Sequence, residues 1–230
     1  MRLLTGVGKP GQIGASLAAA FASQGDTLLL VGRRAQEAEA RAHELRTNGA
    51  DAFGYGADLT DAAQVGALAD RIRREHGQSL TALVHAAGGF AMSGPVCESD
   101  VAVWDTQLSI NLRTAYLVAR GFLPLLRAGK GSIVFFASET ALPGASIASA
   151  SAYAVAKTGV VTLMRAIAAE ERTNGVRANA VAPATVRTAS NVAAMGEDGS
   201  YVELSAVAEA VSFLCSPAAS AVTGQVIRLK

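Results

Sequence analysis

The amino-acid sequence predicts an α/β fold in which helices cover both faces of a doubly wound, parallel β-sheet of about seven strands. Short apolar runs alternate with longer, alanine-rich amphipathic segments along all 230 residues. A glycine-rich segment directly follows the first apolar run, at the place where a βαβ unit turns into its first helix. The length is about 1.5 times that of a typical domain, which favours one domain over residues 1–230.

Seven short apolar runs are the predicted strands, and most segments between them have helical spacing of apolar residues. The strands are expected at residues 2–5, 27–31, 52–57, 80–85, 132–138, 176–181 and 225–229. The clearest helices are expected at residues 13–23, 35–47 and 62–76. This regular alternation is what indicates the parallel sheet.

Local signals define several helix boundaries. Asn48-Gly49 and His76-Gly77 are typical helix ends. Asp58-Leu59-Thr60-Asp61 ends a predicted strand and supplies polar N-cap candidates for the next helix. Pro124 lies inside an apolar helical pattern, so we expect that helix to kink or to end nearby.

Composition and charge exclude several classes of protein. The net charge is +1, because 20 basic residues nearly balance 19 acidic ones, and this gives no support for a nucleic-acid or anionic-membrane partner. With 50% hydrophobic and 17% charged residues the chain is not disordered. The clean apolar runs fall far short of the ~20 residues of a membrane-spanning helix.

Two further expectations concern the compartment. Cys97 and Cys215 have no metal-type spacing, so we expect two reduced, packed thiols and no metal site. The glycine-rich turn begins at Gly6, which leaves no room for a signal peptide. Both observations favour a cytoplasmic protein.

The first predicted strand leads into Thr5-Gly6-Val7-Gly8-Lys9-Pro10-Gly11-Gln12-Ile13-Gly14. Glycines allow the backbone to turn tightly and to approach a pyrophosphate, which the free N–H groups of the following helix can bind. A GxGxxG pattern is weak by itself, and a plain glycine-rich turn is the alternative. Its place between a strand and a helix favours dinucleotide binding.

Two arginines follow the second predicted strand, in Gly32-Arg33-Arg34. Folds that prefer NAD often carry an acidic residue here, which binds the ribose 2′-hydroxyl. Arginine instead suits the dianionic 2′-phosphate. The pattern predicts NADP(H) rather than NAD(H), and the alternative is a pair of solvated arginines at a helix start.

Tyr153 and Lys157 share one face of a predicted helix, because they are four residues apart. A lysine ammonium 4–5 Å from a phenolate would stabilise it by roughly 3–4 kcal/mol at an effective dielectric constant near 20. The pair is therefore expected to act as an acid–base unit with a lowered tyrosine pKa. His85, by contrast, is expected to pack or hydrogen-bond in the interior, and Trp104, Phe135 and Phe136 to lie in the core.

An ordered set of motifs resembles the short-chain dehydrogenase/reductase family over nearly the whole chain. The motifs are Thr5-Gly6 with its loop, Asp58-Leu59, Ala86-Ala87-Gly88, Asn111, Ser138, Tyr153-xxx-Lys157 and the segment from Asn179 to Thr188. The resemblance implies a Rossmann-type fold, a nicotinamide cofactor and a small-molecule carbonyl or secondary-alcohol substrate, with 3-oxoacyl reduction as one familiar case. It also implies a homodimer or homotetramer.

The same resemblance implies residue roles. Tyr153 would be the general acid or base, Lys157 would lower its pKa and hold the nicotinamide ribose, Ser138 would bind the substrate oxygen, and Asn111 would anchor a relay water. Cofactor contacts would come from Gly6, Gly8, Gly11, Gln12, Ile13, Gly14, Arg33, Arg34, Asp58, Leu59, Ala86, Ala87, Gly88, Tyr153, Lys157, Pro183, Val186 and Thr188.

Three features depart from the family pattern. The loop needs two extra residues, and Gln12 replaces its middle glycine, so that the glutamine would crowd the pyrophosphate or donate a hydrogen bond to it. Ser138 precedes Tyr153 by 15 residues, two more than expected, and Thr140 is a weaker rival for its role. Residues 188–202 would form a short substrate lid.

The altered loop keeps a second function open, a nucleotide-binding protein with a regulatory or redox-sensing role and little turnover. Nucleotide-sugar epimerases are disfavoured by the length of the chain. Enoyl reductases are disfavoured by the four-residue spacing from Tyr153 to Lys157.

Overall fold

Seven parallel strands form one sheet in the order β3-β2-β1-β4-β5-β6-β7 in the computed structural model, which describes residues 1–230. The strands are β1 (Arg2–Thr5), β2 (Leu28–Gly32), β3 (Ala52–Gly56), β4 (Ala82–His85), β5 (Ser132–Phe136), β6 (Arg177–Pro183) and β7 (Val226–Leu229). The chain builds outward from β1 to β3 and then crosses to β4, so the strand order reverses between β1 and β4. The predicted fold class is confirmed.

Eight α-helices accompany the sheet: α1 (Ile13–Ala22), α2 (Ala35–Thr47), α3 (Ala62–His76), α4 (Val101–Gln107), α5 (Thr114–Gly129), α6 (Ser151–Glu170), α7 (Ala189–Met195) and α8 (Leu204–Cys215). The predicted bounds of α2 and α3 are met, and the Asp61 carboxylate accepts hydrogen bonds from Ala63 N and Gln64 N as an N-cap. Helix α5 does not end at Pro124 but continues to Gly129, and the alternative of a kink at Pro124 stays a prediction.

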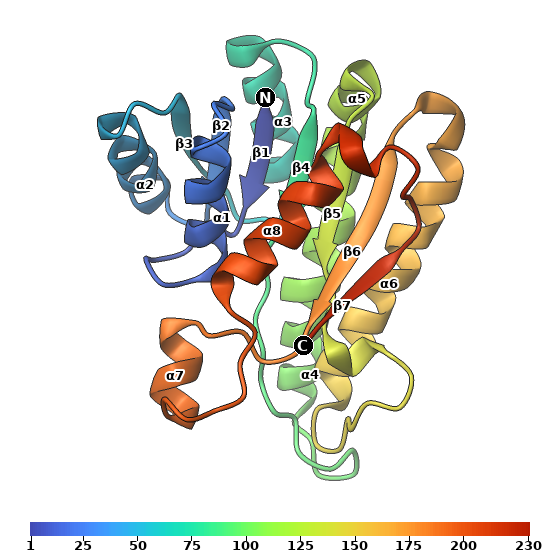
Figure 1. Cartoon of the computed structure of the whole chain (residues 1–230). Coiled ribbons are helices and arrows are strands. Elements are labelled where there is room, and N and C mark those ends of the chain that lie inside the picture. The colour runs from blue at the N-terminus through green and yellow to red at the C-terminus, as the bar shows by residue number, and fades with distance from the viewer.

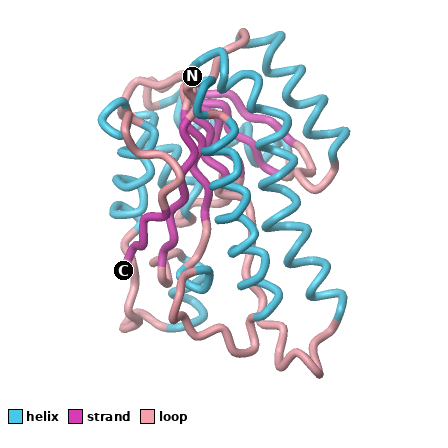
Figure 2. Tube along the Cα trace, turned by 90° about the vertical axis from the view of Figure 1, so that its right-hand side faces the viewer, coloured by secondary structure: helices cyan, strands magenta, loops and turns pink.

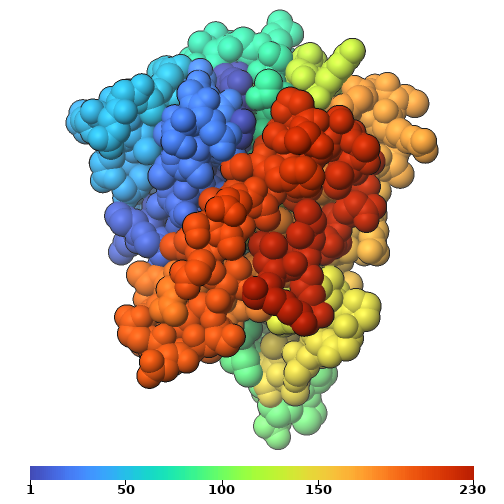
Figure 3. All heavy atoms as spheres, in the orientation of Figure 1, coloured from blue at the N-terminus to red at the C-terminus, as the bar shows by residue number.

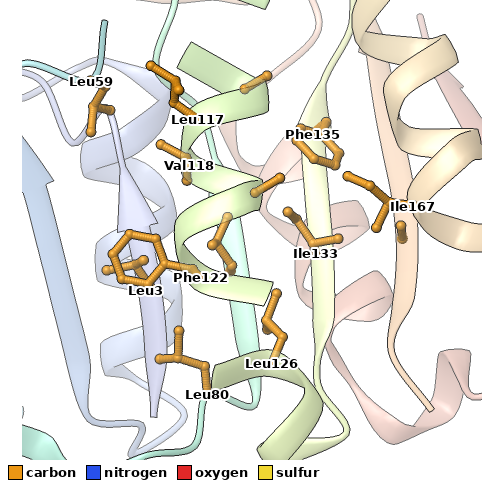
Figure 4. Close-up of a cluster of buried hydrophobic side chains, with 14 of the residues drawn as sticks. Leu3, Leu59, Leu80, Leu117, Val118, Phe122, Leu126, Ile133, Phe135 and Ile167 are labelled. Carbon is orange, nitrogen blue, oxygen red and sulfur yellow. The ribbon is translucent and has the colours of Figure 1, made fainter. Parts of the chain in front are cut away.

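Helices lie on both faces of the sheet (Figures 1 and 2). Two hydrophobic clusters pack α3, α5 and α6 on one face and α1, α2 and α8 on the other. Neighbouring strand residues alternate between them, since successive side chains of a strand point to opposite faces. Leu3 packs with α3, α5 and α6, whereas Leu4 packs with α1, α2 and α8. Figure 4 shows the first cluster, in which Phe122 and Leu126 of α5 lie beside Leu3 and Ile133.

Not every apolar side chain enters these clusters. Phe135 and Phe136 are buried as predicted, but Trp104 is 37% exposed, so its predicted core position is wrong. Its helix, α4, lies beyond the end of the sheet and packs on α6 rather than between layers (Figure 1). Cys215 is buried, which raises the pKa of its thiol to about 11, whereas Cys97 is exposed rather than packed.

Helix α6 is, by length and composition alone, apolar enough to cross a membrane. Half of that stretch is buried against β5, β6 and neighbouring helices, with Val160 and Met164 inside the first cluster. This is the behaviour of a core helix that covers a sheet.

Candidate active site

The carboxyl ends of the parallel strands meet at one edge of the sheet, at the lower end in Figure 1. The loops after β1, β2, β4, β5 and β6, which carry most of the predicted site residues, therefore converge there. Ligands of open parallel sheets bind beyond this edge, near the point where the strand order reverses.

A cavity of about 360 Å³ lies over the reversal between β1 and β4. It is lined by these predicted cofactor contacts: Gly6, Gly8, Arg33, Asp58, Leu59, Ala86, Ala87 and Gly88. Residues that the motifs did not single out also line it, among them Val7, Gly32, Glu37, Thr60 and Thr114. Most of them lie near strand ends, and Thr114 begins α5, so the fold is needed to identify them.

Two glycines of the first loop are required by close backbone approaches. A Cβ on Gly6, which has φ +76°, would lie 2.4 Å from Ala87 N. A Cβ on Gly14 would lie 2.2 Å from Gly6 O, so Gly14 supports the turn without lining the cavity. Gly8, with φ +65°, meets only the Gln12 side chain at 3.4 Å and leaves space above the loop. This cradle fits a dinucleotide pyrophosphate.

The Gln12 side chain does not line this cavity and hydrogen-bonds to α7. Its Nε2 donates a hydrogen bond to Ser190 Oγ at 2.8 Å, in α7, and Gly11 O accepts one from Ala189 N at 3.0 Å. Gln12 occupies the N-cap position of α1, but its side chain accepts no hydrogen bond from the first N–H groups of the helix. Gln12 therefore ties the loop to α7, and its contact with a pyrophosphate stays a prediction.

The two arginines after β2 have different surroundings. Arg33 lines the cavity, whereas Arg34 pairs with Glu37 at 3.0 Å and lies outside it. Asp58, at the end of β3, accepts hydrogen bonds from the Thr60 side chain and backbone, which lower its pKa, and the nearby Arg33 adds to this effect. Of the two arginines predicted to bind a phosphate, only Arg33 lines the cavity.

A second cavity of about 430 Å³ adjoins the first, and Ala86 and Gly88 line both. It brings together Ser138 after β5, Tyr153 and Lys157 on α6, and Pro183 and Val186 after β6, with Ile13 at the start of α1. The cavity beside the glycine loop and the cavity beside the tyrosine–lysine pair therefore form one groove.

Burial dominates the chemistry of the tyrosine–lysine pair. It raises the pKa of Tyr153, and the hydrogen bond with Ser138 offsets only part of this effect. Burial also lowers the pKa of Lys157 to about 8. Lys157 Nζ is 5.7 Å from the centroid of the Tyr153 ring and donates to Phe136 O at 2.7 Å. The expected lowering of the tyrosine pKa by Lys157 is not found, because the ammonium is directed to that carbonyl.

Ser138 rather than Thr140 is the hydroxyl placed beside Tyr153. Ser138 caps a 3-10 turn, Glu139–Ala141, where its Oγ accepts a hydrogen bond from Thr140 N at 3.3 Å. Thr140 Oγ1 is buried and has no hydrogen-bond partner. The spacing of 15 residues to Tyr153 is absorbed by the loop between the turn and α6.

Asn111 lies in a six-residue π-helix, Leu108–Arg113, that joins α4 to α5. Its Nδ2 donates to Gly89 O at 2.9 Å and to Gln107 O at 3.1 Å, and its Oδ1 accepts from Gly89 N at 3.2 Å. It lines neither cavity, but it fixes the Gly88-Gly89 backbone between them. A π-turn of this kind is frequent at functional sites.

The remaining predicted residues support the groove from behind. His85 is buried between Thr5 Oγ1 and Thr114 Oγ1, at 2.9 and 3.2 Å, and burial followed by the charge of Lys157 lowers its pKa to about 3. This confirms the packing role expected for His85. Thr188 caps α7 by accepting from Asn191 N at 3.2 Å and does not line the groove.

Comparisons with known proteins agree with this geometry. Residues 6–229 match a family model described as Enoyl-(Acyl carrier protein) reductase. The chain is 36% identical to 2-(S)-hydroxypropyl-CoM dehydrogenase 3 of Xanthobacter autotrophicus, over 92% of this chain and 88% of that protein. It is 35% identical to cis-4-hydroxycyclohexanecarboxylate dehydrogenase of Sinomonas cyclohexanicum, over 98% and 94% of the two chains.

A solved structure shows the same fold. The gluconate 5-dehydrogenase of Burkholderia cenocepacia, crystallised with NADP and tartrate, matches with a TM-score of 0.90 at 25% identity, over 99% of this chain and 92% of that one. The family match spans almost all of the sequence, and most of the motif residues line one groove. The chain belongs to the short-chain dehydrogenase/reductase family of oxidoreductases.

Proposed function

We propose that the chain transfers a hydride between NADP(H) and a carbonyl or secondary-alcohol substrate, with Tyr153 as the general acid or base. One observation carries the proposal: the glycine cradle and the Ser138–Tyr153–Lys157 cluster lie in adjoining cavities that share Ala86 and Gly88. The relatives named above are dehydrogenases of small hydroxylated compounds, which supports the reaction class.

The residues of the groove supply the proton. When bound, the reduced nicotinamide provides the hydride. The Tyr153 hydroxyl would pass its proton to the substrate oxygen, and the raised pKa keeps this hydroxyl protonated at neutral pH. Ser138 would donate a hydrogen bond to the same oxygen, on which charge develops in the transition state. The Lys157 ammonium would stabilise the phenolate that remains.

The preference for NADP(H) rests on Arg33. Arg33 lines the first cavity near Asp58, and the residue that directly follows β2, where NAD-preferring folds often carry an acidic side chain, is this arginine. A guanidinium there suits a 2′-phosphate. The NADP in the similar gluconate 5-dehydrogenase structure supports this assignment.

We also infer that residues 1–230 act as a single functional domain, that the protein is cytoplasmic, that residues 188–202 serve as a lid, and that copies of the chain form a homo-oligomer.

A surface hollow supports the homo-oligomer. Apolar side chains between α5 and α6, including Leu123 and Leu163, line this hollow of about 330 Å³, and Tyr116 beside them is exposed, which supports a contact between copies. Static light scattering of the purified chain tests the oligomer. A monomer at micromolar concentration would contradict it.

Thermal-shift titration with NADPH and NADH, followed by a carbonyl screen, tests the function. A ligand at 100 times its Kd adds about 2.7 kcal/mol of stability, so we expect the Tm to rise by about 5–10 °C with NADPH. Turnover of at least one small ketone, read from the loss of nicotinamide absorbance, should accompany it. A shift without turnover over a broad panel would favour the regulatory, nucleotide-binding function instead.

A further inference from the structure

The second cavity has an uneven distribution of charge. Among its lining residues only Lys157 and Glu139 are charged. Lys157 is buried at the reacting end, and its ammonium donates to Phe136 O. Glu139 directly follows Ser138 in the 3-10 turn and is partly exposed to the groove, with 32% of its side chain accessible.

Glu139 is held in place from the far edge of the sheet. The Arg228 guanidinium, on β7, pairs with one Glu139 carboxylate oxygen. Arg228 itself does not line the cavity. Figure 3 shows the red C-terminal end of the chain lying against the yellow segment that follows β5. The pair is therefore oriented: its negative end faces the groove, and its positive end lies behind.

No other basic side chain is available to receive an anion there. Arg187, which follows β6, is held by Glu203 at 2.8 Å and by Glu197 at 3.1 Å, and it stacks on Tyr201. The lining also includes Phe90 and Met195, both more than half exposed, and the uncharged Thr185 and Asn191. Away from Lys157, a carboxylate on the substrate would thus meet the Glu139 carboxylate and uncharged side chains, without a counter-ion.

We propose that Glu139, positioned by Arg228, is a specificity-determining residue that selects neutral substrates and rejects those that carry a carboxylate or another anion. Like charges in a partly desolvated groove repel more strongly than they do in water. The Glu139 carboxylate can still accept a hydrogen bond from a neutral hydroxyl or amide group of the substrate. The inference rests on the proposed function, because it concerns the substrate of the same site.

A pair of isosteric ketones tests the proposal. 4-Oxocyclohexanecarboxamide and 4-oxocyclohexanecarboxylate differ in charge and hardly in shape. With saturating NADPH, the kcat/KM of the wild-type chain should be at least about tenfold higher for the amide than for the carboxylate. The difference should arise from a lower KM for the amide. Glu139→Gln should bring the two values to within about threefold by improving the carboxylate. Arg228→Leu, which removes the neutralising partner, should widen the difference instead.

Glu209→Gln is the matched control, because it changes the net charge equally from the exposed face of α8. It should leave the wild-type ratio unchanged. Added salt should narrow the wild-type ratio and not that of Glu139→Gln, because screening acts on the charge of residue 139. The NADPH thermal shift of each variant confirms that its fold and cofactor site are intact.

Binding separates this inference from the proposed function. Calorimetry of both compounds with Tyr153→Phe and NADP⁺ needs no turnover. The inference is supported if the amide binds more tightly than the carboxylate and if Glu139→Gln reduces this preference. If this result is obtained while the wild-type chain reduces neither ketone, only the proposed function fails. Equal or tighter carboxylate binding or turnover, or no binding of either compound, overturns the inference.

Discussion

Lys157 Nζ donates a 2.7 Å hydrogen bond to the carbonyl oxygen of Phe136, the last residue of β5. The bond ties this lysine of α6 to the end of the strand. It places Lys157 Nζ 5.7 Å from the centre of the Tyr153 ring. Because the side chain is buried, the ammonium has few alternative positions. The charge of the site is therefore fixed by the fold rather than by a mobile side chain.

The first prediction concerns alkaline pH. Burial lowers the pKa of Lys157 to about 8, so the side chain carries its positive charge below that pH and loses its proton above it. We expect kcat/KM for ketone reduction to fall as the pH rises through about 8. The depressed pKa also means that the buried charge costs stability below pH 8, and that this cost disappears between about pH 8 and 10.5.

Lys157→Met checks both parts. It should lower kcat/KM at neutral pH by at least about 100-fold, and it should not lower the Tm at pH 7, because it removes a buried charge. The measurements are a pH–rate profile and thermal unfolding at two pH values. A variant that keeps the wild-type rate, or a wild-type profile that is flat through pH 8, would speak against the role given to Lys157.

The second prediction concerns stability in acid. Burial and the charge of Lys157 lower the pKa of His85 from 6.5 to about 3, so the folded chain holds this imidazole neutral while the unfolded chain protonates it. The stabilisation is therefore complete above pH 6.5 and is lost as the pH falls towards 3. The slope is at most about 1.4 kcal/mol per pH unit.

His85→Phe should reduce this slope in urea unfolding between pH 6.5 and 4. It should also cost about 1–3 kcal/mol at pH 7, because Thr5 Oγ1 loses its partner. His43→Gln, a change at an exposed position of α2, is the control and should leave the slope unaltered. An identical slope in His85→Phe and wild type would disprove the assignment.

Part of this picture follows from local sequence signals. The bounds of α2 and α3 are set by neighbours in the chain. Asp61 caps the start of α3, and Gly77, with positive φ, follows its end. Asn48 is the C-cap of α2, and Gly49 after it also has positive φ. Strand bounds shift by a residue or two because pairing partners, not the apolar run itself, decide where a ladder stops.

The remainder depends on contacts between distant residues. Gln12 and Ser190 are 178 residues apart, and Glu139 and Arg228 are 89 apart, so no local pattern reveals either pair. The separation of Arg33 from Arg34 depends on the entry angle of α2, and the exposure of Trp104 depends on where α4 leaves the sheet. The motifs pointed to residues that line the groove, but only the tertiary structure identified the other residues of its walls.

The third prediction separates the two arginines after β2. Arg33→Ala should weaken NADPH binding by about 10- to 100-fold relative to NADH, as expected for one hydrogen bond between charged groups. Arg34→Ala should change the same ratio by less than about threefold, because Arg34 faces Glu37 and lies outside the cavity. Fluorescence titration with both nucleotides measures the ratios. Equal effects of the two variants would refute the distinction.

The fourth prediction concerns Asn111 and the backbone that it holds. Asn111→Leu should lower the free energy of unfolding by about 1–3 kcal/mol, because Gly89 N and O both lose their side-chain partner. Asn111→Asp keeps an acceptor for Gly89 N but cannot donate to Gly89 O, so an intermediate loss is expected. Urea unfolding gives the stabilities, and NADPH titration should show weaker binding in the same order. A fully stable Asn111→Leu chain with wild-type affinity would contradict this role.

The most direct test of the central claim is the single-turnover rate of Tyr153→Phe beside its affinity for NADPH. The phenyl ring keeps the edge-on contact with Phe90, at 5.0 Å between ring centres, and removes only the hydroxyl. We predict an NADPH affinity within about twofold of wild type and a loss of about 10²–10⁴ in the rate of ketone reduction. A rate within tenfold of wild type would show that Tyr153 is not the proton donor.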